Sequence, residues 1–332
     1  MDDKYRNYTI EDIARDLGID KSTVSRALSG KGRISKETRS LVTDFIAEHG
    51  CRLNSMARGL AQGKTFNIGL ALYEDCDMGE VPFFQKCASG ICSTAGENDY
   101  DVLLFRLSTE NPGSLNRIIS SNKIDGVILT RTIVDDPAIS ILTDRGIPFV
   151  VVGSSDDSNV THIDEDHVAA CRELTSRIMQ HGIRHFALMG GKMSLFVNRS
   201  RLAGFSMAVD GHDEIKYDIF RELDSIDAVS AALDAALELG AECVICMDDY
   251  VCRMLLILLH RRHLSIPQDI SVASFYSSSI ISSGIPEICS IDFSAEELGK
   301  TAAGTLLEKL SGRAVEDRLL QSWRIIPGAS VK

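Results

Sequence analysis

From residue 66 onward, short apolar runs alternate with longer stretches in which apolar positions recur at helical spacing. Apolar runs bounded by turn residues are typical of buried strands, and strands that alternate with helices predict parallel sheets joined by right-handed crossovers. The expected strands lie at residues 68–73, 102–105, 127–129, 149–152, 186–189, 243–246, 270–273 and 323–326. The expected helices span residues 83–98, 114–122, 137–145, 166–181, 199–210, 226–239 and 249–263.

The strands form two series, which predict two doubly wound α/β lobes. Ligands of such open sheets lie beyond the carboxyl ends of the strands, so a cleft is expected there. No dinucleotide fingerprint follows the first strand, and no nucleophile and base stand in a recognisable arrangement. We therefore expect a binding protein and not an enzyme.

The first 49 residues follow a different pattern, that of three short helices. Thr9 and Asp12 have the spacing of a capping box, and Asp20 is placed to cap a second helix from Lys21 to Ser29. Ser35 is placed to cap a third helix. Two short helices joined by a turn that contains glycine are the helix-turn-helix pattern, although a generic three-helix cluster would share it.

Charge is divided unevenly along the chain of 332 residues, which has a net charge of −12. Residues 1–64 hold 12 Lys and Arg against 9 Asp and Glu, a net of +3, so the remainder carries −15. A basic head on an acidic body suggests that only the head meets a polyanion.

Nine cysteines, an odd number in a chain of this length, do not suggest a secreted disulfide framework. Cys243 and Cys246 have half of a zinc-site spacing, but no second pair completes it, and we expect them to be buried thiols. The amino-terminal stretch lacks the apolar segment of a signal peptide. We expect a cytoplasmic protein without metal or other cofactor.

Two motifs point to a family. The sequence TIEDIARDLGIDKSTVSRALSGKGRISKETRSLV (residues 9–42) resembles the DNA-binding domain of the LacI/GalR family of bacterial transcription regulators. The segment from Asn54 to Ala61, with Ala57, Arg58 and Leu60, resembles the hinge that follows this domain in the family. The hinge is short and contains Gly59, so it should be marginal as an isolated helix and become ordered on DNA.

The resemblance implies a set of DNA-binding residues. Lys21 and Ser22 would take the first two base-reading places, and Arg26 the place of the recognition helix's arginine. Leu60 would be the apolar wedge that kinks the duplex, with Ala57 against the minor groove. Thr23, Arg33 and Ser35 would hold phosphates, and the set is completed by Thr9, Ser25, Asn54 and Arg58.

The resemblance also implies that the core has the fold of periplasmic binding proteins, with an effector between its lobes. Arg201 matches an arginine that reaches into the cleft. The remaining expected effector residues are Phe84, Thr130, Asp248, Asp249 and Tyr276. Asp249 could instead only cap a helix. Tyr276 and Gly153 stand where the family usually has polar or acidic ligand-binding residues, which leaves a sugar, a glycoside, or an acidic or aromatic metabolite as candidate effectors.

In the family's arrangement the chain crosses between the lobes three times. The expected domains are a helix-turn-helix head over 1–49 and a hinge over 50–65. The first lobe would comprise 66–160 and 293–320, and the second lobe 161–292 and 321–332.

These observations predict a homodimeric, sequence-specific DNA-binding regulator, by family expectation a repressor. Two heads would read a pseudo-palindromic operator, and a small molecule bound between the lobes would control operator affinity. Two alternatives stay open. One is a solute-binding protein, and the other is a cytoplasmic α/β enzyme with an accessory DNA-binding head.

Overall fold

A computed structural model describes residues 8–29, 34–49, 62–74, 82–108, 110–155, 157 and 159–332. Its amino-terminal part is a cluster of three helices, α1 (Ile10–Leu17), α2 (Lys21–Ser29) and α3 (Lys36–Glu48). Each helix contributes one fully buried side chain to a small common core: Ile13, Val24 and Val42. The all-α head predicted from the sequence is therefore confirmed.

Side-chain hydrogen bonds define where these helices begin. The Thr9 hydroxyl accepts a hydrogen bond from the Asp12 amide at 3.1 Å, and the Asp12 carboxylate accepts one from the Thr9 amide at 3.0 Å, which completes the predicted capping box. Asp20 accepts from the Ser22 amide at 2.8 Å, and Ser35 from the Thr38 amide at 3.1 Å. Each such cap stabilises a helix by about 1 kcal/mol.

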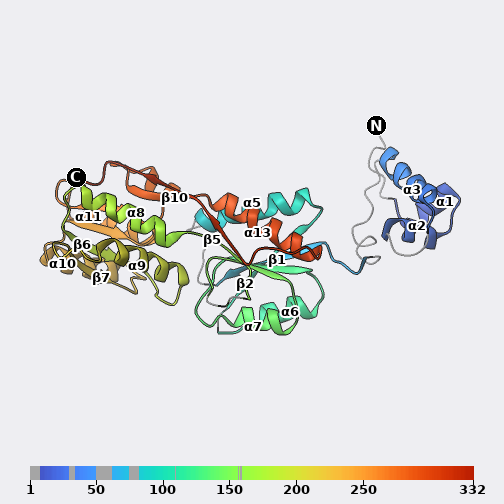
Figure 1. Ribbon diagram of the computed structural model, residues 1–332, viewed down its shortest axis with the longest axis horizontal. Coiled ribbons are helices and arrows are strands. Elements are labelled where there is room, and N and C mark those ends of the chain that lie inside the picture. Colours follow the sequence, from blue (N-terminus) through green and yellow to red (C-terminus); the bar gives the residue numbers. More distant parts are fainter. Residues whose placement is uncertain are drawn as a thin grey trace.

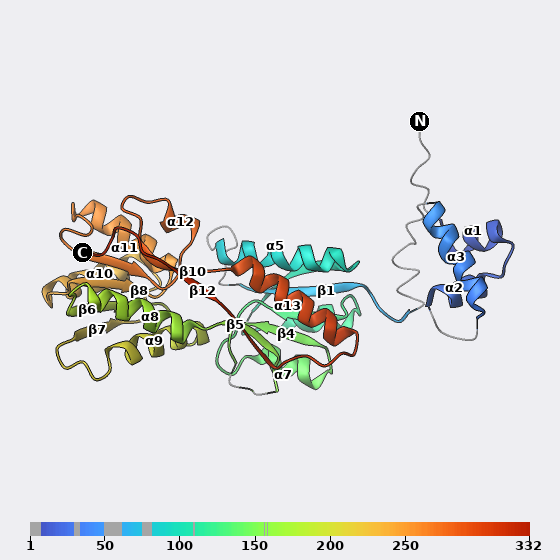
Figure 2. The same ribbon diagram turned by 45° about the horizontal axis from the view of Figure 1, so that its top comes forward.

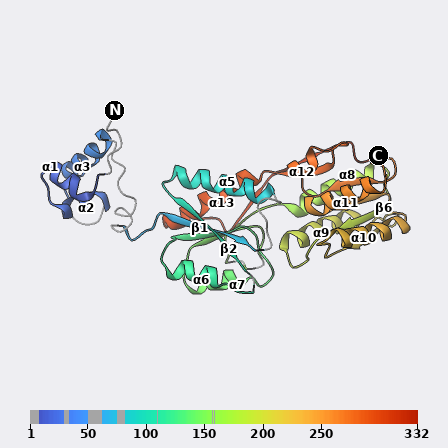
Figure 3. The same cartoon turned by 180° about the vertical axis from the view of Figure 1, so that it is seen from behind.

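The first lobe of the core is a six-stranded parallel sheet in the order β11-β5-β4-β3-β1-β2. Helices α5 and α13 cover one face, and α6 and α7 cover the other (Figures 1 and 3). The bounds are β1 (Asn67–Tyr73), α5 (Pro82–Glu97), β2 (Asp101–Leu107), α6 (Gly113–Ser120), β3 (Gly126–Leu129), α7 (Pro137–Asp144), β4 (Phe149–Val152), β5 (His162–Glu165), α13 (Ala295–Leu310) and β11 (Arg318–Gln321).

The second lobe has a six-stranded sheet in the order β12-β10-β9-β8-β6-β7, parallel except where β12 runs antiparallel to β10. Helices α8 and α9 pack on one face, and α10 and α11 on the other. The bounds are α8 (His167–Gln180), β6 (His185–Met189), α9 (Phe196–Val209), β7 (Lys216–Phe220), α10 (Ile226–Glu238), β8 (Cys243–Cys246), α11 (Asp249–Arg261), β9 (Ser271–Ser274), α12 (Ser279–Ser282), β10 (Cys289–Phe293) and β12 (Trp323–Ile326).

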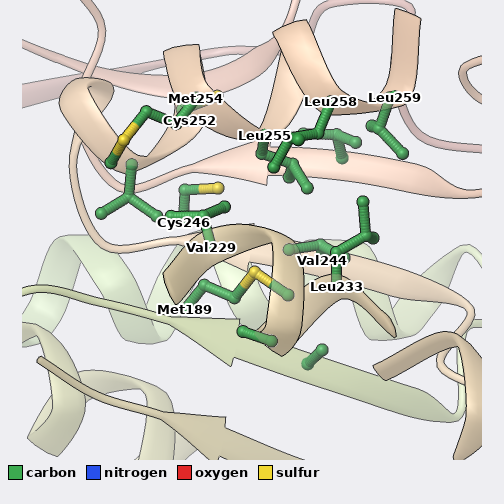
Figure 4. Packing of buried hydrophobic residues seen from close by; sticks show 14 of the residues in the cluster. Met189, Val229, Leu233, Val244, Cys246, Cys252, Met254, Leu255, Leu258 and Leu259 are labelled. Carbon is green, nitrogen blue, oxygen red and sulfur yellow. The ribbon is translucent and has the colours of Figure 1, made fainter. Parts of the chain in front are cut away.

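Figure 4 shows the core between this second sheet and helices α10 and α11. Val229 and Leu233 of α10 and Leu255 of α11 are fully buried there against Val244 and Cys246 of β8. Cys243 packs instead in the core on the other face of the sheet. Because strand side chains alternate between faces, these two cysteines cannot share one metal ion.

Three connections join the two sheets. The chain passes from β5 to α8, from β10 to α13, and from β11 to β12, in agreement with the implied three crossings. Residues 162–165, expected in the second lobe, form β5 of the first sheet. Within the described residues, no helix is long and apolar enough to cross a bilayer.

Helices α5 and α13 lie side by side on the first sheet and touch through their backbones (Figure 2). A Cβ atom added at Gly299 would lie 2.1 Å from the Cys87 carbonyl oxygen, and one at Gly90 would lie 2.1 Å from the Glu296 carbonyl oxygen. Both distances are far below contact distance, so glycine at these two positions sets the spacing of the helices.

We predict that Gly299→Ala lowers the free energy of unfolding by about 1–3 kcal/mol, because the helices must separate to admit the methyl group. Gly304→Ala is the matched control, since a Cβ there meets nothing within 4 Å in the same helix. The control should be neutral or stabilising by up to about 1 kcal/mol. Urea denaturation measures both variants, and equal effects would contradict the close packing.

Candidate functional site

The polar face of α2 carries most of the expected base-reading residues. Lys21, Ser22 and Arg26 are exposed, Thr23 and Ser25 are half-buried, and Val24 and Ala27 face the core of the head. The helix begins with no acidic residue in its first turn. Such a face can approach phosphate and base-edge acceptors without like-charge repulsion.

Some of the expected DNA-binding side chains also have contacts within the head. Lys21 forms an ion pair with Glu11 of α1. Thr9 and Ser35 cap their helices, so any contact they make with phosphate adds to a structural role. The expected residues Arg33, Asn54, Ala57, Arg58 and Leu60 lie outside the described residues, and their roles stay predictions.

A cavity of about 240 Å³ lies between the two lobes of the core. All six expected effector residues line it: Phe84, Thr130, Arg201, Asp248, Asp249 and Tyr276. Gly153, which replaces a polar residue of the family pattern, lines it as well. The other lining residues are Phe83, Arg131, Thr132, Val152, Ser154, Asp164, Glu165, His167, Leu195, Val197, Asn198, Tyr250 and Leu298.

Strand ends place several of these side chains. Thr130 follows β3, Gly153 follows β4, Asp248 closely follows β8, and Tyr276 closely follows β9. The carboxyl ends of parallel strands meet at one edge of each sheet, and these edges face one another across the cavity. The alternation of strands and helices therefore accounts for the position of the cleft.

Arg201 extends from α9 into this cavity and is 7% exposed. Its guanidinium carbon lies 6.0 Å from the ring centre of Tyr276. Its Nε has no hydrogen-bond partner among the described residues. A buried guanidinium with an unused donor suits a ligand that offers hydroxyl or carboxylate oxygens.

Carboxylates also line the cavity, at positions that the sequence did not reveal. Asp164 and Glu165 end β5, and His167 begins α8, with its Nε2 3.6 Å from the Asp164 Oδ1 and 3.5 Å from the Glu165 Oε2. The Ser154 hydroxyl donates to Asp164. Neighbouring strand ends therefore supply carboxyl groups to the cavity in addition to the expected Asp248 and Asp249, although Gly153 and Tyr276 carry none.

Burial changes the pKa values of Asp164, Glu165 and His167. It raises the pKa of Asp164, and together with the neighbouring Asp164 charge it raises the pKa of Glu165 to about 8, against an opposing effect of Arg201. Burial and Arg201 hold the pKa of His167 well below its usual range. At neutral pH the His167 ring is therefore uncharged, and its contacts with the two carboxyl groups are not ion pairs.

The two aspartates at the end of β8 have different roles. Asp248 is the cap of α11, because its Oδ1 accepts from the Val251 amide at 2.8 Å, and the capping role considered for Asp249 is wrong. Asp249 is 4% exposed, and its Oδ2 has no hydrogen-bond partner among the described residues. Asp249 is therefore the member of the pair with an oxygen available to a ligand.

Aromatic rings also line the cavity. The ring centres of Phe83 and Phe84 lie 5.3 Å apart, and those of Phe83 and Tyr276 lie 5.9 Å apart, both edge to face. Phe83 and Phe84 come from α5 of the first lobe and Tyr276 from the second lobe. Aromatic rings in the same cavity as hydroxyl-binding groups are suited to a sugar ring, which has a flat apolar face and polar edges.

Two protein-family models match different parts of the chain. Residues 9–54 match the model for bacterial regulatory proteins of the lacI family, and residues 175–331 match a periplasmic binding protein-like domain. The chain is 26% identical over 328 residues to the HTH-type transcriptional regulator CelR of Thermobifida fusca, with 95% of each chain covered. The chain belongs to the LacI family of bacterial regulatory proteins.

Other LacI-family members resemble the chain over different lengths. The HTH-type transcriptional regulator MalR of Streptococcus pneumoniae is 30% identical over 204 residues, which cover 60% of this chain and 62% of that regulator. The match to this relative therefore spans less than two thirds of its length.

Solved structures of the family share the fold. A lac repressor dimer bound to operator and the anti-inducer ONPF aligns with a TM-score of 0.76 at 21% identity, covering 98% of this chain and 99% of that one. A complex of the transcriptional regulator CelR with cellobiose aligns with a TM-score of 0.71 at 24% identity, covering 98% and 100%. These matches confirm the predicted architecture of a helix-turn-helix head and two α/β lobes.

The raised pKa of Glu165 makes the stability of this LacI-family protein depend on pH. The folded protein keeps a proton that the unfolded chain releases near its ordinary pKa of 4.5, so this group makes the free energy of unfolding fall as pH rises from about 4.5 to about 8. We predict that Glu165→Gln removes this part of the dependence and stabilises the protein at pH 8 by on the order of a few kcal/mol. Chemical denaturation at several pH values measures the change, and parallel profiles for both proteins would contradict it.

Proposed function

We propose that the protein is a cytoplasmic, homodimeric, sequence-specific DNA-binding transcriptional regulator that acts as a repressor. The observation that carries the proposal is the union in one chain of a helix-turn-helix head and a two-lobed core with a cavity between the lobes. The head would bind DNA, and the cavity would bind the signal. A solute-binding protein would not need the head, and an enzyme would need neither the head nor a cavity between two lobes.

The contact of the head with DNA would be made by α2 in the major groove. Lys21, Ser22 and Arg26 would reach base edges, while Thr23 and Ser35 would contact phosphates. Two copies of the head in a homodimer would read two half-sites of a pseudo-palindrome. The hinge residues from Asn54 to Leu60 would then contact the minor groove at its centre.

The ligand would be a sugar or glycoside. The Arg201 Nε and the Asp249 Oδ2 have no hydrogen-bond partner among the described residues, and Phe83, Phe84 and Tyr276 offer aromatic surface. Four carboxyl groups line the cavity beside two guanidinium groups, so it offers both acceptors and donors for hydroxyl groups, which favours a polyhydroxy ligand over an acidic metabolite. The complex of CelR with cellobiose is consistent with this ligand class.

Ligand binding would act on DNA through the lobes. A molecule held between them stabilises the closed arrangement, because its contacts to both lobes exist only when the lobes are close together. Residues 62–66 connect the first lobe with the segment that follows the head, so a change in lobe orientation is transmitted toward the hinge. Operator affinity would change as a result. We assign no catalytic step to the protein.

We predict that the purified protein retains a set of sheared genomic fragments that share a pseudo-palindrome, and that Arg26→Ala reduces this enrichment at least tenfold because the helix loses a base contact worth about 1–3 kcal/mol. Leu60→Gly should have a similar effect by removing the wedge. Arg324→Ala is a matched control, since this exposed arginine lies on β12, far along the chain from the head, and pairs with Asp292.

Sequencing of the retained fragments is the measurement. Enrichment of one motif by wild type and Arg324→Ala, but not by Arg26→Ala, supports the proposal. Equal enrichment of the motif by all three proteins would contradict the role of Arg26, and retention of fragments without any common motif by wild type would contradict the proposed function.

A further inference from the structure

Glu165 occupies a special place in the fold, at the first crossing between the lobes. It is the last residue of β5 in the first sheet, and the next residue, Asp166, caps α8 of the second lobe by accepting from the Ala169 amide at 3.0 Å. A ligand that touches Glu165 therefore touches the chain segment about which the two lobes are joined.

The side chain of Glu165 is enclosed but incompletely hydrogen-bonded. It is 3% exposed, it lines the cavity, and its Oε1 has no hydrogen-bond partner among the described residues. A buried polar oxygen without a partner is unfavourable, and a hydrogen bond to a ligand atom in the cavity would remove this cost. Glu165 is thus a cavity-lining side chain with hydrogen-bonding capacity that the described residues do not use.

Several titratable or charged groups surround Glu165. Asp164 is its neighbour on β5, Arg201 faces it from α9, and His167 contacts its Oε2 from α8. Asp292 on β10 also raises the pKa of Glu165, and the Glu165 charge in turn raises the pKa of Tyr276 after β9 and of Cys87 on α5. Only Arg201 favours the ionised form, so burial and the adjacent carboxylates prevail and the pKa of Glu165 is raised to about 8.

We propose that Glu165 binds the effector as a neutral carboxylic acid, donating its proton in a hydrogen bond to an oxygen of the ligand. This inference rests on the proposed function, because it assigns a residue to the same effector cavity. A carboxylic acid is both donor and acceptor, so one side chain can hold the donor and acceptor faces of a single hydroxyl group. A carboxylate in this position could only accept.

The second crossing lies against the same cluster. The ring of Phe293, at the end of β10, lies 4.6 Å from the ring of His167 in an edge-to-face arrangement, and it stacks on Tyr276 at 6.4 Å. Helix α13 of the first lobe begins two residues later. A ligand bound to Glu165 therefore acts beside two of the three connections between the lobes, where a small displacement changes their relative orientation.

A binding role for protonated Glu165 makes the affinity for the effector depend on pH. Only the protonated fraction of Glu165 can donate, and apparent affinity falls in proportion to the competent fraction. With a pKa of about 8, wild-type affinity for a neutral sugar should be constant below pH 7.5 and about 30-fold lower at pH 9.5. Glu165→Gln keeps a donor and an acceptor of the same size but does not titrate, so its affinity should vary less than threefold over this range.

Isothermal titration calorimetry with cellobiose and with maltose, at pH 6.5, 7.5, 8.5 and 9.5, tests this on the full-length protein. Glu238→Gln is the matched control, an exposed glutamate on α10 of the second lobe, and it should follow wild type at every pH. Glu165→Ala should lose at least tenfold in affinity at pH 7.5, while Glu165→Gln retains wild-type affinity within a few-fold.

The outcomes separate this inference from the proposed function. A pH dependence in wild type and Glu238→Gln that Glu165→Gln lacks supports the role of Glu165, even if the protein enriches no operator. The same pH dependence in all three proteins, or none in wild type, overturns it while leaving a sugar-controlled regulator in place. If wild type enriches an operator but binds neither sugar, the ligand class and the role of Glu165 are both overturned, and DNA recognition stands.

Discussion

The organisation of the cleft depends on the electrostatic interaction between the buried guanidinium group of Arg201 and the carboxyl groups around it. Burial raises the pKa of Asp164, Glu165 and Asp248, and the positive charge of Arg201 opposes this rise without cancelling it. Charges withdrawn from water are tolerated only where opposite charges and hydrogen bonds compensate them. Arg201 belongs to the second lobe and Asp164 and Glu165 to the first, so this electrostatic balance extends across the interface between the lobes.

The sheet topology explains why such a cluster forms at this place. Both sheets direct the carboxyl ends of their parallel strands toward one cavity, and the connection from β5 to α8 passes directly along it. Residues that line the cavity and residues that join the lobes are consequently adjacent in sequence, as Glu165 and Asp166 are. Binding and lobe orientation can then be coupled without a long chain of intermediates.

Much of the fold follows from local patterns in the sequence. The buried strands β1, β3, β4 and β8 are continuous apolar runs, and the amphipathic helices around them have clear periods, so their positions were predictable. Strands β5 and β7 were not, because His162–Glu165 is polar and short and Lys216–Phe220 is an edge strand with exposed residues. A strand of this kind is defined by its neighbours in the sheet and not by its own hydrophobicity.

The candidate site was predictable to the same extent. Residues at the ends of recognisable strands, such as Asp248 and Tyr276, could be assigned to the cavity from the resemblance to the family. Asp164, Glu165 and His167 could not, because they lie on the unrecognised strand β5 and at the start of α8. Their protonation states depend on burial and on Arg201, which stands more than thirty positions away in the sequence and is brought near only by folding.

In the proposed mechanism, a ligand in the cleft changes the affinity of the head for DNA. Fluorescence anisotropy of a labelled operator, measured with and without a saturating concentration of a sugar that binds the protein, tests it directly. A coupling of about 1–3 kcal/mol predicts a change in operator Kd of about 5- to 150-fold in wild type and none in Arg201→Ala. An unchanged operator Kd in wild-type protein whose cleft is occupied by the sugar would contradict the account.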